Sequence, residues 1–266
     1  MKKRVISAII MLSIFIPFLI KGEIYFTVFM SILSVLGVYE LLKVRENKKE
    51  FPILLKIIAY ILTLYFCLYN INSIDFEYSL SYRIMAIIIF LFTIPMVFIN
   101  DTKKYNLNDA LFLIGTILFI GFSFNLIITA RNYDLNYMIY LILITTITDT
   151  FALITGMLVG NHKLCPKISP KKTYEGLLGG VFMGTFVASA FYNTVIGKTP
   201  LLTIVLATLI LSIIGQIGDL VFSSIKRYYD VKDFSDLIPG HGGILDRFDS
   251  LIFVTLTFII LLGLIY

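Results

Sequence analysis

Long apolar runs separated by short polar clusters extend along the whole chain. A helix needs roughly 20 residues to cross the hydrocarbon of a bilayer, so runs of this length predict transmembrane helices. Three of these runs, residues 5–20, 84–99 and 251–266, are short and can cross the bilayer only if it thins locally or the helix tilt is favourable. The predicted spans are residues 5–20, 24–42, 53–69, 84–99, 111–130, 137–159, 176–197, 201–222 and 251–266. The pattern therefore predicts an all-α polytopic membrane protein with about nine transmembrane helices.

Composition agrees with this pattern. The 266 residues are 58% apolar and 15% charged, with a mean hydropathy of +0.92, whereas soluble domains are about 45–50% apolar and about 25% charged. The spans leave no room for a large soluble domain. A receptor-like ectodomain, a separate Rossmann domain and most nucleic-acid binders are excluded, and we expect no nucleic-acid partner.

The basic residues are distributed unevenly between the two sides of the predicted membrane. Eighteen of the 22 lie in the N-terminal segment and in residues 43–56, 100–109, 160–175 and 223–250, and the other four are Lys21, Arg83, Arg131 and Lys198. Lys and Arg are retained on the cytoplasmic side. The asymmetry predicts a cytoplasmic N-terminus, a C-terminus on the outer side and a place in the cell (inner) membrane.

The two halves of the chain differ in polar content. Residues 1–145 form hydrophobic spans and plain loops, which indicates a scaffold, whereas residues 146–266 carry nearly all the unusual polar residues and two cytoplasmic loops, 160–175 and 223–250. Cysteine adds little, because His162 and Cys165 make half a zinc site at best. We expect the chemistry in the second half.

Asp149 and Asp219 lie inside the sixth and eighth predicted spans. An ionisable residue at depth requires a partner, a water-filled cavity or a proton. In the eighth span, polar residues recur at spacings of three and four and so share one helix face. They are Ser212, Gln216, Asp219, Ser223 and Lys226. Such a stripe predicts the wall of a site; an isolated acid could also be a buried, neutral residue.

Loop 223–250 is rich in glycine and in acidic and basic residues. Its glycines allow close approach of the backbone to a ligand, and its bases can neutralise phosphate oxygens. Asp246 and Asp249 share a face if a helix begins there. Together with Asp219 they predict a hard-cation site, and the hard cation that works with phosphates is Mg²⁺. The alternative is that residues 223–250 form an ordinary charged loop exposed to solvent, with no site.

Loop 160–175 is the second basic element. Lys171, Lys172 and Thr173 precede the seventh predicted helix, whose free N–H groups favour anions. They are candidates for holding a polyphosphate. The alternative is that the lysines only orient the chain and Thr173 caps the helix.

The residues from Ser223 to Asp249 resemble the signature of the phosphatidate cytidylyltransferases, also called CDP-diacylglycerol synthases. The matching pattern is Ser-x-apolar-Lys-Arg, then Lys-Asp, then His-Gly-Gly-apolar-x-Asp-Arg-apolar-Asp. The upstream segment 169–176 and Asp149-Thr150 followed by Gly156 and Gly160 also resemble that family. The resemblance covers about residues 149–249.

The resemblance implies an integral membrane enzyme that converts CTP and phosphatidate to CDP-diacylglycerol and pyrophosphate in phospholipid biosynthesis, with Mg²⁺ and often as a homodimer. A second cation such as K⁺ is a further candidate, and membrane lipid is an expected partner. Metal is assigned to Asp219, Asp246 and Asp249, which with Lys226, Arg227 and His241 form the expected catalytic set. The expected substrate-binding residues are Asp149, Lys171, Lys172, Thr173, Ser223, Gly242, Gly243 and Arg247.

Two other functions fit parts of the pattern. A related CTP-using lipid enzyme, such as a CDP-archaeol synthase or a polyprenol kinase, would share the nucleotide site, and a kinase would release CDP rather than pyrophosphate. A cation-coupled transporter would also carry intramembrane acids and Gly-broken helices, but it would not need clustered bases around a His-Gly-Gly loop.

Overall fold

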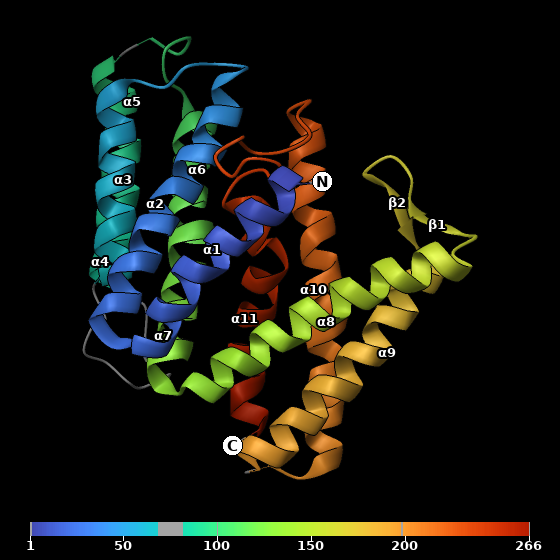
Figure 1. Ribbon diagram of the computed structural model, residues 1–266. Helices are drawn as coiled ribbons and strands as arrows, with labels where there is room; N and C mark the ends of the chain where they lie inside the picture. The colour runs from blue at the N-terminus through green and yellow to red at the C-terminus, as the bar shows by residue number, and fades with distance from the viewer. Residues whose placement is uncertain (1, 69–81, 100, 198, 266) are drawn as a thin grey trace. The chain divides into compact units, whose positions relative to one another are not determined.

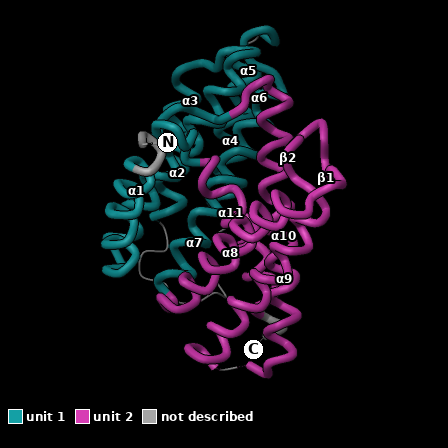
Figure 2. The backbone as a smooth tube through the Cα atoms, turned by 45° about the vertical axis from the view of Figure 1, so that its right-hand side comes forward, with its two compact units in different colours: residues 1–132, 233–244 teal, residues 133–232, 245–266 magenta. Residues whose placement is uncertain are grey.

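The computed structural model describes residues 2–68, 82–99, 101–197 and 199–265, which form helices and one small sheet (Figure 1). The predicted spans 53–69 and 251–266 end on residues 69 and 266, and Lys198 was counted among the outer bases; these three residues lie outside the described ranges. The chain divides into two compact units, neither of which is continuous in sequence (Figure 2). Unit 1 is Met1–Asn132 with Asp233–Ile244, and unit 2 is Tyr133–Lys232 with Leu245–Tyr266.

The described part of unit 1 is mostly helical. Its elements are α1 (Lys2–Lys21), α2 (Glu23–Glu46), α3 (Ile53–Leu68), α4 (Tyr82–Thr93), α5 (Pro95–Ile99), α6 (Leu107–Thr116), the π-helical turn η1 (Ile117–Gly121) and α7 (Phe122–Tyr133), which ends at the unit boundary. Through η1 the helices α6 and α7 run on as one apolar stretch, Leu107–Tyr133.

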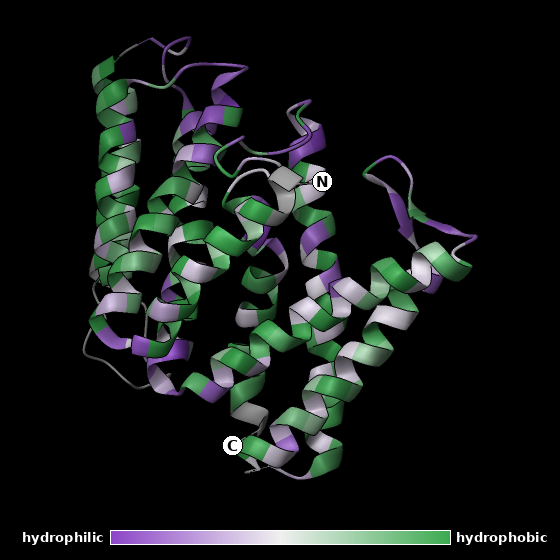
Figure 3. Ribbon diagram, viewed as in Figure 1, coloured by the Kyte–Doolittle hydropathy of each residue, from purple (hydrophilic) through white to green (hydrophobic). Residues whose placement is uncertain are grey.

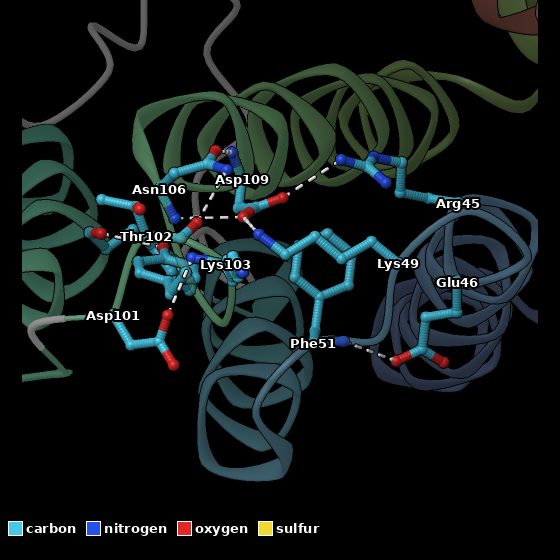
Figure 4. Close-up of polar contacts among 11 residues, drawn as sticks. Arg45, Glu46, Lys49, Phe51, Asp101, Thr102, Lys103, Asn106 and Asp109 are labelled. Atoms are coloured by element: carbon cyan, nitrogen blue, oxygen red, sulfur yellow. Dashed lines mark hydrogen bonds and ion pairs between the residues drawn. The ribbon is translucent and has the colours of Figure 1, made fainter.

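A buried carboxylate joins the polar ends of the helices in unit 1 (Figure 4). Asp109 is 1% exposed and accepts from the Arg45 guanidinium at 3.1 Å and from the Lys49 ammonium. It also forms a capping box with Asn106 at the start of α6, which satisfies backbone N–H groups that have no partner inside the helix. One acid thus links the end of α2 to the beginning of α6.

Unit 2 contains the long helices of the second half. They are α8 (Leu135–Val159), α9 (Tyr174–Phe191) with the π-helical turn η2 (Tyr192–Ile196), α10 (Leu201–Tyr228) and α11 (Leu245–Ile265). Between α8 and α9 the antiparallel strands β1 (Lys163–Cys165) and β2 (Ser169–Thr173) form a hairpin. This small sheet within loop 160–175 was not anticipated from the sequence, and Figure 3 shows hydrophilic residues interleaved with apolar ones along it.

Glycines bring α8 and α9 together, and the two helices lie side by side (Figure 1). A Cβ on Gly184 would lie 2.0 Å from Thr148 Oγ1, and a Cβ on Gly180 would lie 2.5 Å from the Thr148 carbonyl oxygen. Small residues allow helix backbones to approach closely where lipid gives no hydrophobic drive. Elsewhere in unit 2, a Cβ on Gly218 of α10 would lie 2.7 Å from Phe253 Cβ of α11, so this glycine likewise allows close packing of two helices.

The predicted hydrophobic runs coincide with observed helices. Among the described residues, five apolar helical stretches are long enough to cross a membrane: Glu23–Glu46, Leu107–Tyr133, Leu135–Val159, Tyr174–Ile196 and Leu201–Tyr228. Three shorter apolar stretches, Ile6–Lys21, Ile53–Leu68 and Ile84–Ile99, match the predicted spans at 5–20, 53–69 and 84–99. The chain is therefore a helical membrane protein; the count of nine spans and the sides of the termini stay predictions.

Candidate active site

Three acids from three helices of unit 2 interact electrostatically with one another. They are Asp149 in α8, Asp219 in α10 and Asp249 in α11, which we call the carboxylate cluster. Asp149 is exposed although it lies within an apolar helix, and Asp219 and Asp249 are half-buried. Like charges gathered in this way raise the energy of the ionised cluster, which a bound cation would relieve.

Basic groups and hydroxyls already contact the cluster. The Lys172 ammonium lies 2.7 Å from Asp219 Oδ2 and also donates to the carbonyl oxygen of Gln216 at 3.3 Å. The Ser223 hydroxyl donates to Asp219 Oδ1 at 3.3 Å. Lys172 is held in place by β2, so the unanticipated hairpin is what carries this base to α10.

A second ion pair lies at the beginning of α11. Lys226 Nζ is 2.6 Å from Asp246 Oδ1, and the two side chains are only 10% and 3% exposed. Asp246 is in the first turn of α11, where the free N–H groups of the helix stabilise a negative charge. The expectation that a helix has begun at Asp246 and Asp249 is confirmed.

Ser250 was missed by the sequence reasoning. Its hydroxyl donates to Asp149 Oδ2 at 3.4 Å, and its backbone N–H donates to Asp249 Oδ1 at 2.8 Å. A serine in an apolar helix is an ordinary residue, so its type alone gave no signal. Its position directly after Asp249 was the available clue.

Gln216 belongs to the predicted polar stripe of the eighth span but was given no role. Its side chain is 1% exposed, and its amide nitrogen has no hydrogen-bond partner among the described residues. Such a group is costly to bury unless something satisfies it. It lies one helical turn before Asp219 along α10.

Other predicted residues have structural contacts of their own. The Thr173 hydroxyl accepts from Gly176 N–H at 3.1 Å and caps α9, so the capping alternative holds for this side chain. The Arg227 guanidinium donates to the carbonyl oxygens of Ile168 at 3.3 Å and Val231 at 2.9 Å. Arg227 therefore ties the end of α10 to the β1–β2 turn.

The remaining predicted residues divide between exposed positions and the other unit. Lys171 and Arg247 are exposed, and Arg247 is within electrostatic reach of Asp149. His241, Gly242 and Gly243 belong to residues 233–244, which are part of unit 1 and which we call the glycine loop. Helix α10 also continues to Tyr228, so Ser223, Lys226 and Arg227 lie on a helix and not in a loop starting at residue 223.

The residues of unit 2 fit a divalent cation in the type of their ligand atoms. The described residues contain no group of three His, Cys, Asp or Glu side chains arranged to hold a metal ion by themselves. Mg²⁺ in nucleotide enzymes is usually bound by one or two carboxylates together with substrate phosphates and waters. Asp219 and Asp249 offer that partial set of oxygen ligands.

Comparison with known proteins gives a consistent result. The sequence profile of the cytidylyltransferase family matches residues 2–265. The chain is 35% identical over 255 residues to the phosphatidate cytidylyltransferase of Staphylococcus aureus (strain COL), with 96% of each chain covered. It is 35% identical to the protein of that name from Staphylococcus epidermidis (strain ATCC 12228 / FDA PCI 1200) and 34% identical to that from Staphylococcus haemolyticus (strain JCSC1435), again over 96% of each chain.

Proposed function

The chain belongs to the cytidylyltransferase family, and from that premise we propose that it transfers the CMP moiety of CTP to phosphatidate, giving CDP-diacylglycerol and pyrophosphate. The observation that carries this proposal is the match of nearly the whole chain both to the family and to relatives named phosphatidate cytidylyltransferase. The bacterial source of these relatives and the apolar helices of the chain support a location in the cell membrane.

The reaction needs positioning more than a strong base. A phosphate oxygen of phosphatidate attacks the α-phosphorus of CTP, the bond to the bridging oxygen breaks, and pyrophosphate leaves with its electron pair. The attacking phosphate monoester is already ionised near neutral pH, since its second pKa is about 6. Catalysis then rests on in-line alignment and on neutralisation of the charge on phosphate oxygens.

Lys172 and Lys226 supply fixed positive charge for this purpose. Lys172 forms an ion pair with Asp219 at 2.7 Å, and Lys226 forms one with Asp246 at 2.6 Å. Phosphate oxygens compete for such ammonium groups with charge-assisted hydrogen bonds. We assign Lys172, beside exposed Lys171, to the triphosphate of CTP, and Lys226 with Ser223 to the reacting phosphates.

Mg²⁺ is part of the proposal. Asp219 and Asp249 would hold it, with Asp246 as the third acid of the set, and the cation would supply charge neutralisation at the triphosphate. The mutual repulsion within the carboxylate cluster supports a cation there. A second cation such as K⁺ would be bound by the same acids, with Asp149 as the additional carboxylate.

The sidedness and assembly of the enzyme are further parts of the proposal. CTP is a cytoplasmic nucleotide, and the basic residues of loop 160–175 are the ones that the positive-inside rule retains on that side. We propose that the site faces the cytoplasm and that the enzyme acts as a homodimer. A cysteine introduced at exposed Lys171 should be protected from an impermeant thiol reagent in intact cells, and labelling from outside would overturn this orientation.

The direct test measures incorporation of labelled CTP into lipid by the purified protein, with phosphatidate as acceptor and with or without Mg²⁺. Asp219→Asn should abolish incorporation because it removes a carboxylate that contacts both Lys172 and Ser223. Asp230→Asn is a matched control, since Asp230 lies just past α10 with a φ of 56° that asparagine tolerates. Near-normal activity of Asp219→Asn, or release of CDP in place of pyrophosphate, would contradict the proposal.

A further inference from the structure

The glycine loop has a tight turn but no helix or regular strand of its own. His241 N–H donates to the Ile238 carbonyl at 2.8 Å, and Gly240 has a φ of 79°, which with Pro239 before it matches a type II turn. Ile238 N–H then donates to the Gly242 carbonyl at 2.9 Å. These bonds shape the tip of the loop and leave its two ends to be fixed by other parts of unit 1.

Glu40 of α2 fixes both ends. Its side chain is 1% exposed, and its Oε1 accepts from the Ser235 hydroxyl at 2.6 Å and from Ile244 N–H at 2.8 Å. Ser235 lies near the start of the loop, and Ile244 is its last residue, immediately before α11. One carboxylate oxygen therefore closes the loop at its base.

Gly243 is required by the same carboxylate. A Cβ at this position would lie 2.4 Å from Glu40 Oε1 and 2.6 Å from Oε2, closer than real contacts allow. The second glycine of the His-Gly-Gly motif therefore makes room for an acid of α2 within unit 1. The sequence reasoning had assigned this glycine to close approach of a ligand only.

A second residue of the N-terminal half contacts the tip of the loop. Ser7 Oγ of α1 lies 2.8 Å from His241 Nδ1. This bond fixes the orientation of the imidazole ring, and the bond on one ring nitrogen determines what the other can do. Helices α1 and α2, which lie in the half of the chain expected to be a scaffold, thus hold the loop at its base and at its histidine.

We propose that Glu40 is a positioning residue, which fixes the glycine loop and, together with Ser7, the orientation of His241, a member of the expected catalytic set. The catalytic consequence of this inference rests on the proposed function, whereas the anchoring of the loop by Glu40 does not. Glu40 does not touch the substrate in this proposal and acts only through the loop. Burial of an acid in an apolar helix is costly without hydrogen-bond donors, and the glycine loop supplies two of them to Glu40.

Hydrogen exchange measured by mass spectrometry on the full-length purified protein tests the anchoring directly. In Glu40→Leu both donors lose their acceptor, so amides of residues 233–244 should exchange at least about tenfold faster, while peptides of α8 and α9 keep their protection. Glu40→Gln keeps an amide oxygen as a weaker, neutral acceptor, and exchange in the loop should rise by about three- to tenfold. Unchanged loop exchange in Glu40→Gln would overturn the proposal even if Glu40→Leu fails to fold.

Enzyme kinetics test the consequence. Glu40→Leu should lower kcat/KM for CTP by about 10²-fold, as expected for a misplaced site, and Glu40→Gln should recover most of the loss. Glu46→Leu is the matched control, because this acid of the same helix bonds Lys56 Nζ at 2.8 Å and Phe51 N–H at 3.2 Å. It should remain within about threefold of wild type, consistent with the small worth of a partly exposed ion pair.

The outcomes separate the two proposals. A wild-type protein that incorporates no CTP into lipid, with loop exchange still dependent on Glu40, would refute the proposed function and leave the anchoring established. An active wild type whose loop exchange and kinetics are the same in Glu40→Leu and Glu46→Leu would refute the positioning role alone.

Discussion

The Lys226–Asp246 ion pair allows catalysis and stability to be separated. Asp246→Asn removes the negative partner from an ammonium whose side chain is 10% exposed, at a contact of 2.6 Å. Breaking a buried pair on one side costs about 3–5 kcal/mol, because a buried charge is left without compensation. At roughly 2–4 °C per kcal/mol for a chain of this size, Tm should fall by roughly 6–20 °C.

The double variant Lys226→Met/Asp246→Leu removes both charges and fills the space with apolar groups. Replacing a whole buried pair in this way is often neutral or stabilising, so its Tm should return to within a few degrees of wild type. CTP incorporation should be absent in Asp246→Asn, which lacks an acid assigned to the metal, and also in the double variant, which lacks both that acid and the Lys226 ammonium assigned to phosphate. The pair of variants thus compares a destabilised inactive enzyme with a stable inactive one.

The assays are thermal unfolding in detergent, followed by a thiol-reactive or intrinsic fluorescence probe, and labelled-CTP incorporation at a temperature well below either Tm. If the double variant regains activity to within tenfold of wild type, the pair only stabilises the fold and the reasoning that assigns it to the reaction is wrong.

Three other predictions concern packing, capping and the polar anchor of unit 1. Gly184→Ala places a methyl group against Thr148 Oγ1 and should lower stability by about 1–3 kcal/mol, measured by chemical denaturation. Thr173→Ala removes the α9 cap and should lower the free energy of unfolding by about 1 kcal/mol. KM for CTP should rise if the hairpin that carries Lys172 loosens. An unchanged Tm would contradict the capping role. Asp109→Asn leaves Arg45 and Lys49 without their shared acid and should lower Tm by several degrees with KM for CTP unchanged, and a changed KM would show that this network reaches the site.

The hydrophobic pattern predicted the helices well because a bilayer imposes a simple rule. Each span must satisfy its backbone internally and must present apolar side chains to lipid, so runs such as 137–159 and 201–222 are visible without tertiary information. The ends of helices are less constrained. Helix α10 extends beyond residue 222 to Tyr228 because Ser223 and Lys226 have partners in unit 2.

The sequence indicated several of the side chains that lie together in unit 2, but not their contacts. The acids and the Lys and Ser residues were identified from their types and spacing, and Asp219, Lys172 and Ser223 do lie together. The contact of Lys172 with Asp219 depends on the β1–β2 hairpin, whose strands of three and five residues are too short to give a periodic signal. Glu40 lies inside the predicted span 24–42 as an intramembrane acid and could have been recognised by the same argument as Asp149.

The anchoring of the glycine loop has a consequence for biosynthesis. Glu40 is separated from Ser235 by 195 residues and from Ile244 by 204, and Ser7 is 234 residues from His241. During translation the carboxylate of α2 therefore enters the membrane long before either donor has been made. The two bonds that close the loop can therefore form only after residue 244 has been made, and a chain released before residue 235 would lack both of these donors to the Glu40 carboxylate.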